Sequence, residues 1–250
     1  MVIIPKLQGG YLKVHYPVFK NLAVTVATLA VLGTNVFAAS IPAIPVNKPE
    51  WFARHEGFLQ QGRTSKIDLL FFGDSITDFW RGDGNYIWKK TFIPMGAADF
   101  GIGGDKVENV LWRVRNGELD QINPRVVVLL IGTNNLTTNT VDEITATQAE
   151  LVAEIRQRSP ATKILLFGIF PRATRWSAEF NKNIAPINLI LSQLDEGRFI
   201  RFMDIGEKFK SPYGEISQKI MYDGLHLTEK GYQIWTDAML PTLLELRKSK

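Results

Sequence analysis

The sequence of 250 residues contains no cysteine and only three histidines. Without cysteine, the chain has no disulfide bond, no thiolate nucleophile and no cysteine ligand for a metal. A metal site with three histidine ligands would need His15, His55 and His226 at once, and His15 lies in a segment that is predicted to be removed. We therefore expect no metal site in the mature protein.

The sequence also lacks a strong excess of charge. The formal net charge is +4, and three lysines lie in residues 1–38, which contain no acidic residue. The rest of the chain has 26 basic and 25 acidic residues, so we expect no basic surface and no nucleic-acid partner. Hydrophobic residues make up 45% and charged residues 22%, which is typical of a soluble globular protein. The length fits one sizeable domain.

Residues 1–38 have the pattern of a secretory signal peptide. Basic residues up to Lys20 precede an apolar, uncharged run over residues 21–39, with small residues near Ala38 where a signal peptidase cleaves. Cleavage there predicts a secreted or periplasmic protein with no stable membrane insertion. The run is close to the length that spans a membrane, so an uncleaved signal anchor is the alternative. A start of translation later than Met1 is a further alternative.

The next segment separates the signal from the folded domain. Residues 39–50 contain three prolines and no helical or strand periodicity, which predicts an extended linker. The domain itself is expected over residues 51–250, beginning with a short amphipathic helix over residues 51–61. No internal repeat follows, so the simplest organisation is a single domain.

Short apolar runs alternate with amphipathic patterns through this domain. Strands are predicted at residues 67–72, 97–100, 125–131, 163–168 and 198–203, and helices at 106–117, 141–158, 181–195 and 228–247. Three of the strands are nearly unbroken hydrophobic runs, as in parallel strands that are buried on both faces. The alternation predicts a doubly wound α/β sheet, in which ligands bind beyond the carboxyl ends of the strands.

A serine and a glycine-rich loop follow two of the predicted strands. Ser75 stands at a strand-to-helix turn that can project its hydroxyl into the crevice, although serine is also an ordinary helix N-cap. The residues around it lack the G-x-S-x-G pattern of the α/β-hydrolase fold. Residues 100–105 (FGIGGD) lack the spacing of a dinucleotide-binding loop, because Lys106 stands where the last glycine is required. This loop is either a flexible turn or a backbone that donates an N–H group to a ligand.

Two further segments carry amide and imidazole side chains. The most hydrophobic strand is followed by Asn134 and Asn135. A carboxamide there can donate to a developing oxyanion or simply form a turn. Asp223 and His226 are three residues apart before the last helix, so the carboxylate can orient the imidazole as a general base. A lone histidine near a helix start is often structural, but only His55 offers another imidazole beyond the signal segment.

Taken together, FFGDSITDFW, FGIGGD, IGTNN and DGLHLT resemble the sequence blocks of the SGNH hydrolases, also called GDSL esterases and lipases. The resemblance extends from Phe71 to the last helix and implies a three-layer α/β/α fold with a flavodoxin-like sheet of about five parallel strands. It implies these site residues: Ser75, Asp223 and His226 as the catalytic triad, and Ser75, Gly104 and Asn134 as the oxyanion hole. It implies no metal and no cofactor.

Within that family, two stretches of the sequence allow a closer comparison. FGIGGDKVENVLWRVRNGEL and VVVLLIGTNN are most similar to the catalytic subunits of the intracellular platelet-activating-factor acetylhydrolases. Secreted bacterial carbohydrate acetylesterases share much of the same pattern. Asn135 departs from the aspartate that many members carry after the donor asparagine.

We therefore expect a serine esterase, a carboxylic ester hydrolase, that removes short acyl groups, above all acetyl, from a small-molecule or carbohydrate ester. A lipid-type acylhydrolase (lysophospholipase, thioesterase or platelet-activating-factor acetylhydrolase-like) is the alternative, and an inactive SGNH-fold binding module is the lesser one. Trp80, Trp88, Trp112 and Trp176 can either stack on a sugar or pack in the core. The sequence does not decide the acyl chain length, the acceptor or the oligomeric state.

Overall fold

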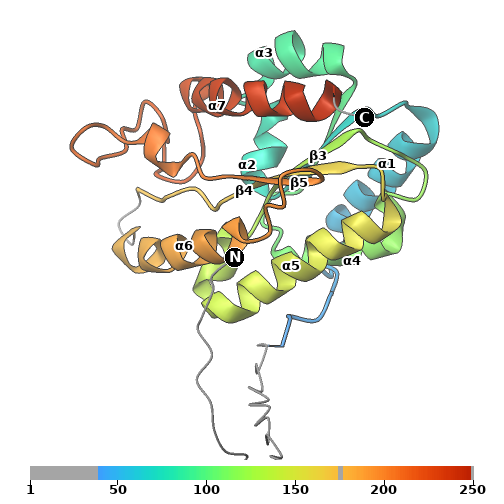
Figure 1. Cartoon of the computed structure of the whole chain (residues 1–250), viewed down its shortest axis with the longest axis horizontal. Helices are drawn as coiled ribbons and strands as arrows, with labels where there is room; N and C mark the ends of the chain where they lie inside the picture. The colour runs from blue at the N-terminus through green and yellow to red at the C-terminus, as the bar shows by residue number, and fades with distance from the viewer. Residues whose placement is uncertain (1–38, 174–176, 249–250) are drawn as a thin grey trace, which may run out of the picture. The chain divides into compact units, whose positions relative to one another are not determined.

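A sheet of five parallel strands forms the centre of the structure, a computed structural model that describes residues 39–173 and 177–248 (Figure 1). The strand order is β2-β1-β3-β4-β5. The strands are β1 (Leu69–Gly73), β2 (Ala97–Gly101), β3 (Val126–Leu130), β4 (Lys163–Phe167) and β5 (Ile200–Met203). This is the flavodoxin-like order, and it confirms the predicted fold. The predicted signal peptide, residues 1–38, and Trp176 lie outside the described residues.

The direction of winding reverses between β1 and β3. The chain passes from β1 to the edge strand β2 and then returns to β3 on the other side of β1. Leu69 of β1 is level with Ala97 of β2 and with Val126 of β3, so the carboxyl ends of these strands also lie level. A crevice forms outside the carboxyl ends at such a reversal. Ser75 and Asn134 follow the two strands that flank it.

Helices cover both faces of the sheet (Figure 1). The helices are α1 (Pro49–Thr64), α2 (Ser75–Asp78), α3 (Asn85–Ile87), α4 (Val107–Arg113), α5 (Val141–Arg158), α6 (Ser177–Ser192) and α7 (Glu229–Lys248). Because side chains alternate along a strand, Leu70 and Phe72 join a buried cluster with α1, α4, α5 and α6. Leu69 and Phe71 join a second cluster with α3 and α7. Burial on both faces explains why these strands are hydrophobic throughout.

The segment before β1 differs in detail from its prediction. Helix α1 begins at Pro49, two residues earlier than expected, because proline fits the first turn of a helix. Residues 39–48, predicted as a linker, contain no helix or strand. They are attached to the domain, since the Ile41 amide donates to Thr147 Oγ1 at 2.8 Å and Asn109 Nδ2 donates to the Ile44 carbonyl at 2.9 Å.

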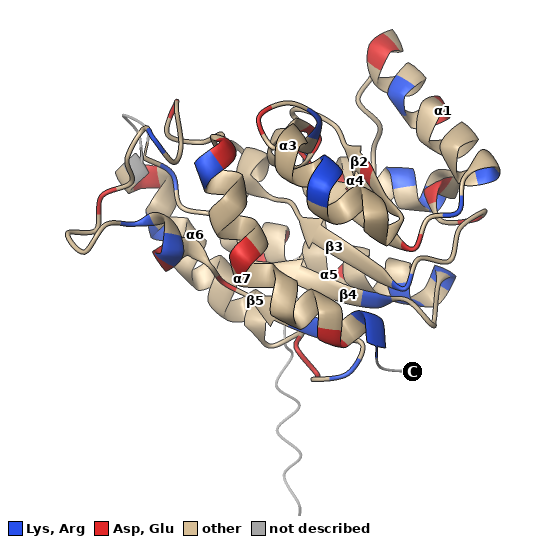
Figure 2. Cartoon of the chain, turned by 90° about the horizontal axis from the view of Figure 1, so that it is seen from above, with Lys and Arg blue, Asp and Glu red and all other residues tan. Residues whose placement is uncertain are grey.

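Charged residues of both signs are distributed over the helices and loops (Figure 2). No large region in this view carries one sign alone, in keeping with nearly equal numbers of basic and acidic residues beyond residue 38. Over the described part of the chain, every helix is too short or too polar to serve as a membrane span.

Candidate active site

The turn after β1 fixes the position of Ser75. Gly73 ends the strand, and a Cβ atom there would lie 2.4 Å from the Leu130 carbonyl oxygen, so only glycine fits. The side chain of Asp74 accepts a hydrogen bond from the Ile76 amide at 3.0 Å and caps α2. Ser75 is therefore the first residue of a helix at the carboxyl edge of the sheet, with 9% of its surface exposed.

His226 and Asp223 lie on the loop that precedes α7, and His226 is 151 residues from Ser75 in the sequence. Ser75 Oγ and His226 Nε2 are 2.9 Å apart, and His226 Nδ1 and Asp223 Oδ2 are 2.6 Å apart. The second oxygen of Asp223 accepts the backbone amides of Leu225 and His226 at 2.9 and 2.7 Å. The structure thus brings the three predicted side chains together in one line of hydrogen bonds.

Neighbouring groups fix the orientation of the imidazole. The rings of Phe79 and Tyr222 pack against His226, with centroid separations of 5.0 and 5.9 Å. Partial burial raises the pKa of Asp223, but hydrogen bonds from the amide and ring of His226 outweigh it and hold this pKa below the usual value. An ionised Asp223 accepts a hydrogen bond from the Nδ1–H group of His226, which keeps that proton on Nδ1 and leaves Nε2 free to take the Ser75 hydroxyl proton.

The glycine-rich loop after β2 lies beside Ser75. A Cβ atom on Gly103 would be 3.9 Å from the Ser75 Cβ atom. Gly104 has a φ angle of +84°, a backbone conformation that favours glycine. Within the described residues, the amides of Ser75 and Gly104 donate to no protein acceptor. Both N–H groups are therefore available to a ligand.

Asn134 lies on the 3₁₀ turn Thr133–Thr137 that follows β3. Its Nδ2 donates one hydrogen bond to the Asp105 carbonyl oxygen at 2.8 Å. A carboxamide nitrogen has two protons, so the second remains for a ligand. This hydrogen bond joins Asn134 to the residue after Gly104, and the loop at Gly103 lies beside Ser75. The three predicted oxyanion donors therefore belong to adjoining segments.

Two residues that support this arrangement were not recognised in the sequence. The buried Arg172 donates from Nη2 to the Thr133 carbonyl at 2.6 Å and from Nε to Thr133 Oγ1 at 3.0 Å, so it fixes the residue before Asn134. Asn135 is fully buried, accepts the Val107 amide at 3.0 Å and donates to Glu108 Oε2 at 2.8 Å. In the sequence, the only sign of this was the pair of adjacent asparagines, Asn134 and Asn135, of which one can be structural.

We expect Asn134 and Asn135 to respond differently to substitution. Asn134→Ala should lower kcat by ~10²–10³-fold and leave KM nearly unchanged, because the donor acts on the oxyanion rather than on the bound ester. Asn135→Ala should instead lower the free energy of unfolding by ~1–3 kcal/mol, because it leaves buried polar groups unpaired. Steady-state kinetics and urea unfolding of both variants measure this; an effect of Asn134→Ala on KM alone would contradict the donor role.

Asp74, unlike the exposed Asp223, is a fully buried acid at the site. Complete burial raises its pKa from 3.8 to about 7, although the hydrogen bond from the Ile76 amide opposes the shift. A carboxyl whose pKa is higher in the folded state binds its proton more tightly there. The stabilisation is fully present below the unfolded pKa of 3.8 and is lost as the pH rises towards 7.

Asp74→Asn should therefore flatten the pH dependence of stability. Asparagine is also a good N-cap and is neutral at every pH. We expect the free energy of unfolding to fall between pH 4 and pH 7 by less in the variant than in the wild type, with a difference on the order of 2 kcal/mol. Urea unfolding followed by tryptophan fluorescence at these two pH values measures the difference. Equal slopes would show that Asp74 is ionised in the folded protein throughout this range.

His55, the other histidine of the domain, belongs to a buried polar network. Its Nδ1 lies 2.8 Å from Glu118 Oε1, and Arg113 lies between Glu118 and Asp105 at 3.0 and 2.9 Å. Trp51 Nε1 completes the network by donating to Asp105 Oδ1 at 2.7 Å. The side chains of this network are bonded to one another and not to His226, as expected of a structural element.

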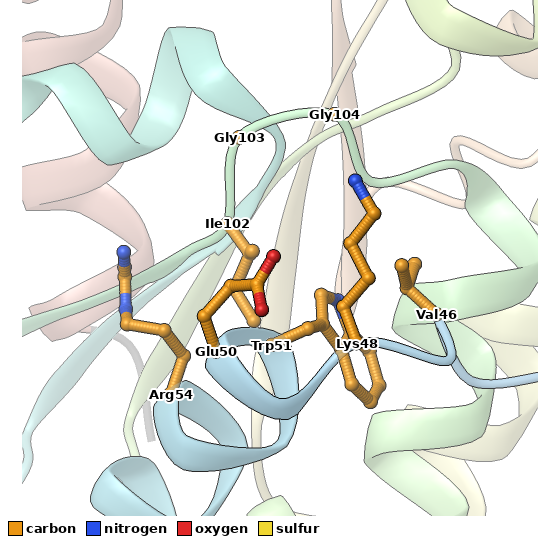
Figure 3. Close-up of a pocket in the computed structure, with 8 residues that line it drawn as sticks. All are labelled: Val46, Lys48, Glu50, Trp51, Arg54, Ile102, Gly103 and Gly104. Atoms are coloured by element: carbon orange, nitrogen blue, oxygen red, sulfur yellow. The ribbon is translucent and has the colours of Figure 1, made fainter.

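A pocket of about 430 Å³ adjoins the glycine-rich loop (Figure 3). Gly103 and Gly104 form one of its walls. The remaining lining comes from the residue after β2 (Ile102), from the first turns of α1 (Glu50, Trp51 and Arg54) and from the segment before α1 (Val46 and Lys48). The pocket therefore borders a predicted oxyanion donor and offers space for a part of the substrate beyond the acyl group.

The tryptophans considered as sugar-stacking residues are mainly in the core. Trp80 is fully buried and Trp88 is 5% exposed, and their rings pack against each other at 5.9 Å. Trp112 packs against Trp51 at 5.5 Å. Trp176 lies outside the described residues. Trp80 and Trp88 therefore offer no surface on which a sugar could stack.

A hydroxyl, an imidazole and a carboxylate joined in this way at the carboxyl edge of a doubly wound sheet form the arrangement that serine hydrolases use. The chain belongs to the GDSL-like lipase/acylhydrolase family, whose model matches residues 71–234. The matched range includes Ser75, Gly104, Asn134, Asp223 and His226. The protein is thus a hydrolase of the class that acts on esters.

Individual relatives agree with this family. Platelet-activating factor acetylhydrolase IB subunit alpha2 of Rattus norvegicus is 37% identical over 183 residues, which cover 73% of this chain and 78% of the relative. A GDSL-like lipase from Bacteroides thetaiotaomicron has a TM-score of 0.61 at 19% identity, covering 78% of this chain and 98% of that one. A catalytic mutant of an acetylxylan esterase from Geobacillus stearothermophilus has a TM-score of 0.56 at 18% identity, covering 75% and 97%. At such identities the two structures support the fold alone.

Proposed function

We propose that the protein is a serine-dependent esterase in which Ser75 is the nucleophile, His226 the general base and Asp223 the residue that orients it. The proposal rests on the continuous pair of hydrogen bonds, 2.9 and 2.6 Å long, that links Ser75 Oγ through the imidazole to Asp223. A nucleophile, its base and the group that orients the base are the parts that acyl transfer requires.

The reaction proceeds through an acyl-enzyme. Ser75 Oγ attacks the ester carbonyl carbon while its proton passes to His226 Nε2, and the carbonyl oxygen becomes an oxyanion bound by the Ser75 and Gly104 amides and Asn134 Nδ2. His226 then gives the proton to the alcohol oxygen as the alcohol departs, and the acyl group remains on Ser75. A water molecule deprotonated by His226 attacks this acyl group, the acid is released and Ser75 regains its proton. Residues of this chain supply every proton transfer, so the cycle uses no cofactor.

A short acyl group on a lipid-type alcohol is the substrate class that we favour. The support comes from the curated relative at 37% identity, whose name specifies an acetylhydrolase of platelet-activating factor. Two features fit an alcohol larger than the acyl group. The pocket of about 430 Å³ beside Gly104 can take such an alcohol, and it is lined by apolar side chains together with the charged Lys48, Glu50 and Arg54.

An acetylated carbohydrate is the second candidate, and it is less well supported. The acetylxylan esterase is 18% identical to this chain. An identity at this level supports a shared fold and not a shared substrate. Trp80 and Trp88 are buried in the core rather than placed to stack on a sugar. Thioesters and lysophospholipids are further lipid-type alternatives, and a panel of substrates distinguishes among all of these.

A substrate panel tests the proposal. Hydrolysis rates should be measured for p-nitrophenyl esters of increasing acyl length, for an acetylated phospholipid, a lysophospholipid and an acyl thioester, and for acetylated xylan. We expect the acetyl ester to be fastest in the p-nitrophenyl series and the acetylated phospholipid to be preferred over xylan. Absence of Ser75-dependent hydrolysis across the panel would favour the inactive binding module. Export of the protein remains a prediction from residues 1–38, which N-terminal sequencing of the mature protein would test.

A further inference from the structure

Helix α1 lies outside the part of the chain that the family model matches, residues 71–234. It nevertheless contacts the loop that carries Gly104. Trp51, in the first turn of α1, lines the same pocket as Gly103 and Gly104 (Figure 3), and its Nε1 donates to Asp105 Oδ1 at 2.7 Å. We propose that Trp51 is a positioning residue for the oxyanion hole: its indole N–H fixes Asp105, and Asp105 in turn sets the positions of the Gly104 amide and the Asn134 side chain. The inference rests on the proposed esterase function.

The loop needs such a restraint because its own residues supply little. Gly104 has a φ angle of +84°, and among the described residues no atom beyond its two chain neighbours lies within 4 Å of the position that its Cβ would take. Glycine loses more conformational freedom on ordering than any other residue. Contacts of the neighbouring residues must therefore define where the Gly104 amide points. On the N-terminal side, the Gly103 amide donates to Asp78 Oδ2 at 3.3 Å.

Asp105 provides the restraint on the other side of Gly104. Its side chain is fully buried and has two partners on different helices, Trp51 Nε1 at 2.7 Å and Arg113 Nη2 at 2.9 Å. Its backbone carbonyl accepts Asn134 Nδ2 at 2.8 Å. One residue thus connects the peptide that follows Gly104 to the Asn134 carboxamide, so a shift of Asp105 moves two oxyanion donors together.

Trp51 is itself rigidly placed. It is 4% exposed, and its ring packs against Trp112 at 5.5 Å and stacks on His55 at 6.1 Å. His55 Nδ1 pairs with Glu118 at 2.8 Å, so the first turns of α1 are fixed to the segment that follows α4. The indole N–H is therefore a donor in a fixed position, and the carboxylate that it binds has no access to water as a substitute.

Trp51→Phe removes this N–H and keeps an aromatic ring, although a smaller one, in the same cluster. We expect kcat per active site to fall between about 10- and 100-fold, because a displacement of the oxyanion donors by a fraction of an ångström weakens binding of the transition state. KM should remain within about twofold, since the oxyanion forms only after the ester is bound. The concentration of active sites is determined from the stoichiometry of fluorophosphonate labelling, so a loss of folded protein does not count as a loss of kcat.

A boronic acid gives a readout that a purely structural role of Trp51 would leave unchanged. It adds reversibly to the Ser75 hydroxyl, which forms a B–O bond and gives up its proton to His226, and the tetrahedral adduct places an oxygen in the oxyanion hole. We expect the inhibition constant of Trp51→Phe to rise by about the same factor as kcat falls. An unchanged inhibition constant together with an unchanged kcat would overturn the proposal.

Trp112→Phe is the matched control. Trp112 belongs to the same aromatic cluster, and no hydrogen bond of its indole N–H is present among the described residues. We expect it to keep the wild-type kcat and inhibition constant. A loss in this variant equal to that in Trp51→Phe would mean that packing, and not the hydrogen bond to Asp105, is what matters.

Asp105→Asn keeps the inference testable if Trp51→Phe does not fold. It retains an oxygen acceptor but loses the ion pair with Arg113, and it should also lower kcat at nearly constant KM. Where both variants fold, the double variant should lose less than the product of the two single losses, because both act through one residue. The two proposals can fail separately. Activity that survives in Ser75→Ala would rule out the esterase mechanism. An inactive Ser75→Ala variant, together with wild-type kinetics in Trp51→Phe, would rule out only the role of Trp51.

Discussion

Ser75→Ala is expected to lower kcat by about 10⁵–10⁶-fold, the largest effect of any single substitution in this protein. Without the hydroxyl no acyl-enzyme can form, and the remaining rate comes from the oxyanion donors and from substrate binding. The folded structure should be unaffected, because among the described residues the Ser75 hydroxyl makes one hydrogen bond, to His226 Nε2. Steady-state hydrolysis of p-nitrophenyl acetate, with urea unfolding in parallel, measures both quantities.

Two comparisons make this result specific. Ser65→Ala removes an exposed hydroxyl at the end of α1, and it should leave both the rate and the labelling by a fluorophosphonate unchanged. His226→Ala should lose nearly as much activity as Ser75→Ala, and the double variant should lose no more than either, because the two residues act as one unit. Retention of more than about one hundredth of the wild-type rate in Ser75→Ala would assign the nucleophile to another residue.

The elements that the sequence predicts well depend on local patterns. β1, β3 and β4 are buried on both faces and therefore read as continuous apolar runs. The predicted triad depends on more than this, since Ser75 and His226 are 151 residues apart. The triad could be predicted from the sequence because Ser75 follows a strand of a parallel sheet, and the carboxyl ends of these strands lie at one edge. With so few imidazoles in the domain, the choice of base was also narrow.

The parts that were missed depend on tertiary contacts between charged groups. Arg113 and Glu118 are charged residues of kinds that are usually exposed, yet both are almost completely buried, because Arg113 pairs with Glu118 and Asp105 and Glu118 also pairs with His55. Arg172 binds a backbone carbonyl, and backbone acceptors are present at every position and leave no mark in the sequence. The attachment of residues 39–48 was missed for the same reason, since Ile41 bonds to Thr147 through its backbone amide.

Asp223→Asn is expected to lower kcat by about 10³–10⁴-fold while leaving the fold intact. The carboxylate accepts a hydrogen bond of 2.6 Å from the Nδ1–H group of His226, and an asparagine in its place can present an N–H group to the same nitrogen. The imidazole would then carry its proton on Nε2, directed at Ser75, where it cannot accept the hydroxyl proton. The kinetics of the variant at saturating p-nitrophenyl acetate measure the loss.

The exposure of Asp223 determines how large this loss is. Its side chain is 42% exposed, so in Asp223→Ala a water molecule can take the place of the carboxylate and accept the Nδ1 proton. Asp223→Ala should therefore retain more activity than Asp223→Asn, although it removes more of the side chain. A carboxylate that acted mainly through its charge would give similar losses in the two variants. An alanine variant that is as slow as the asparagine variant would thus show that the negative charge, and not the tautomer of His226, is what Asp223 contributes.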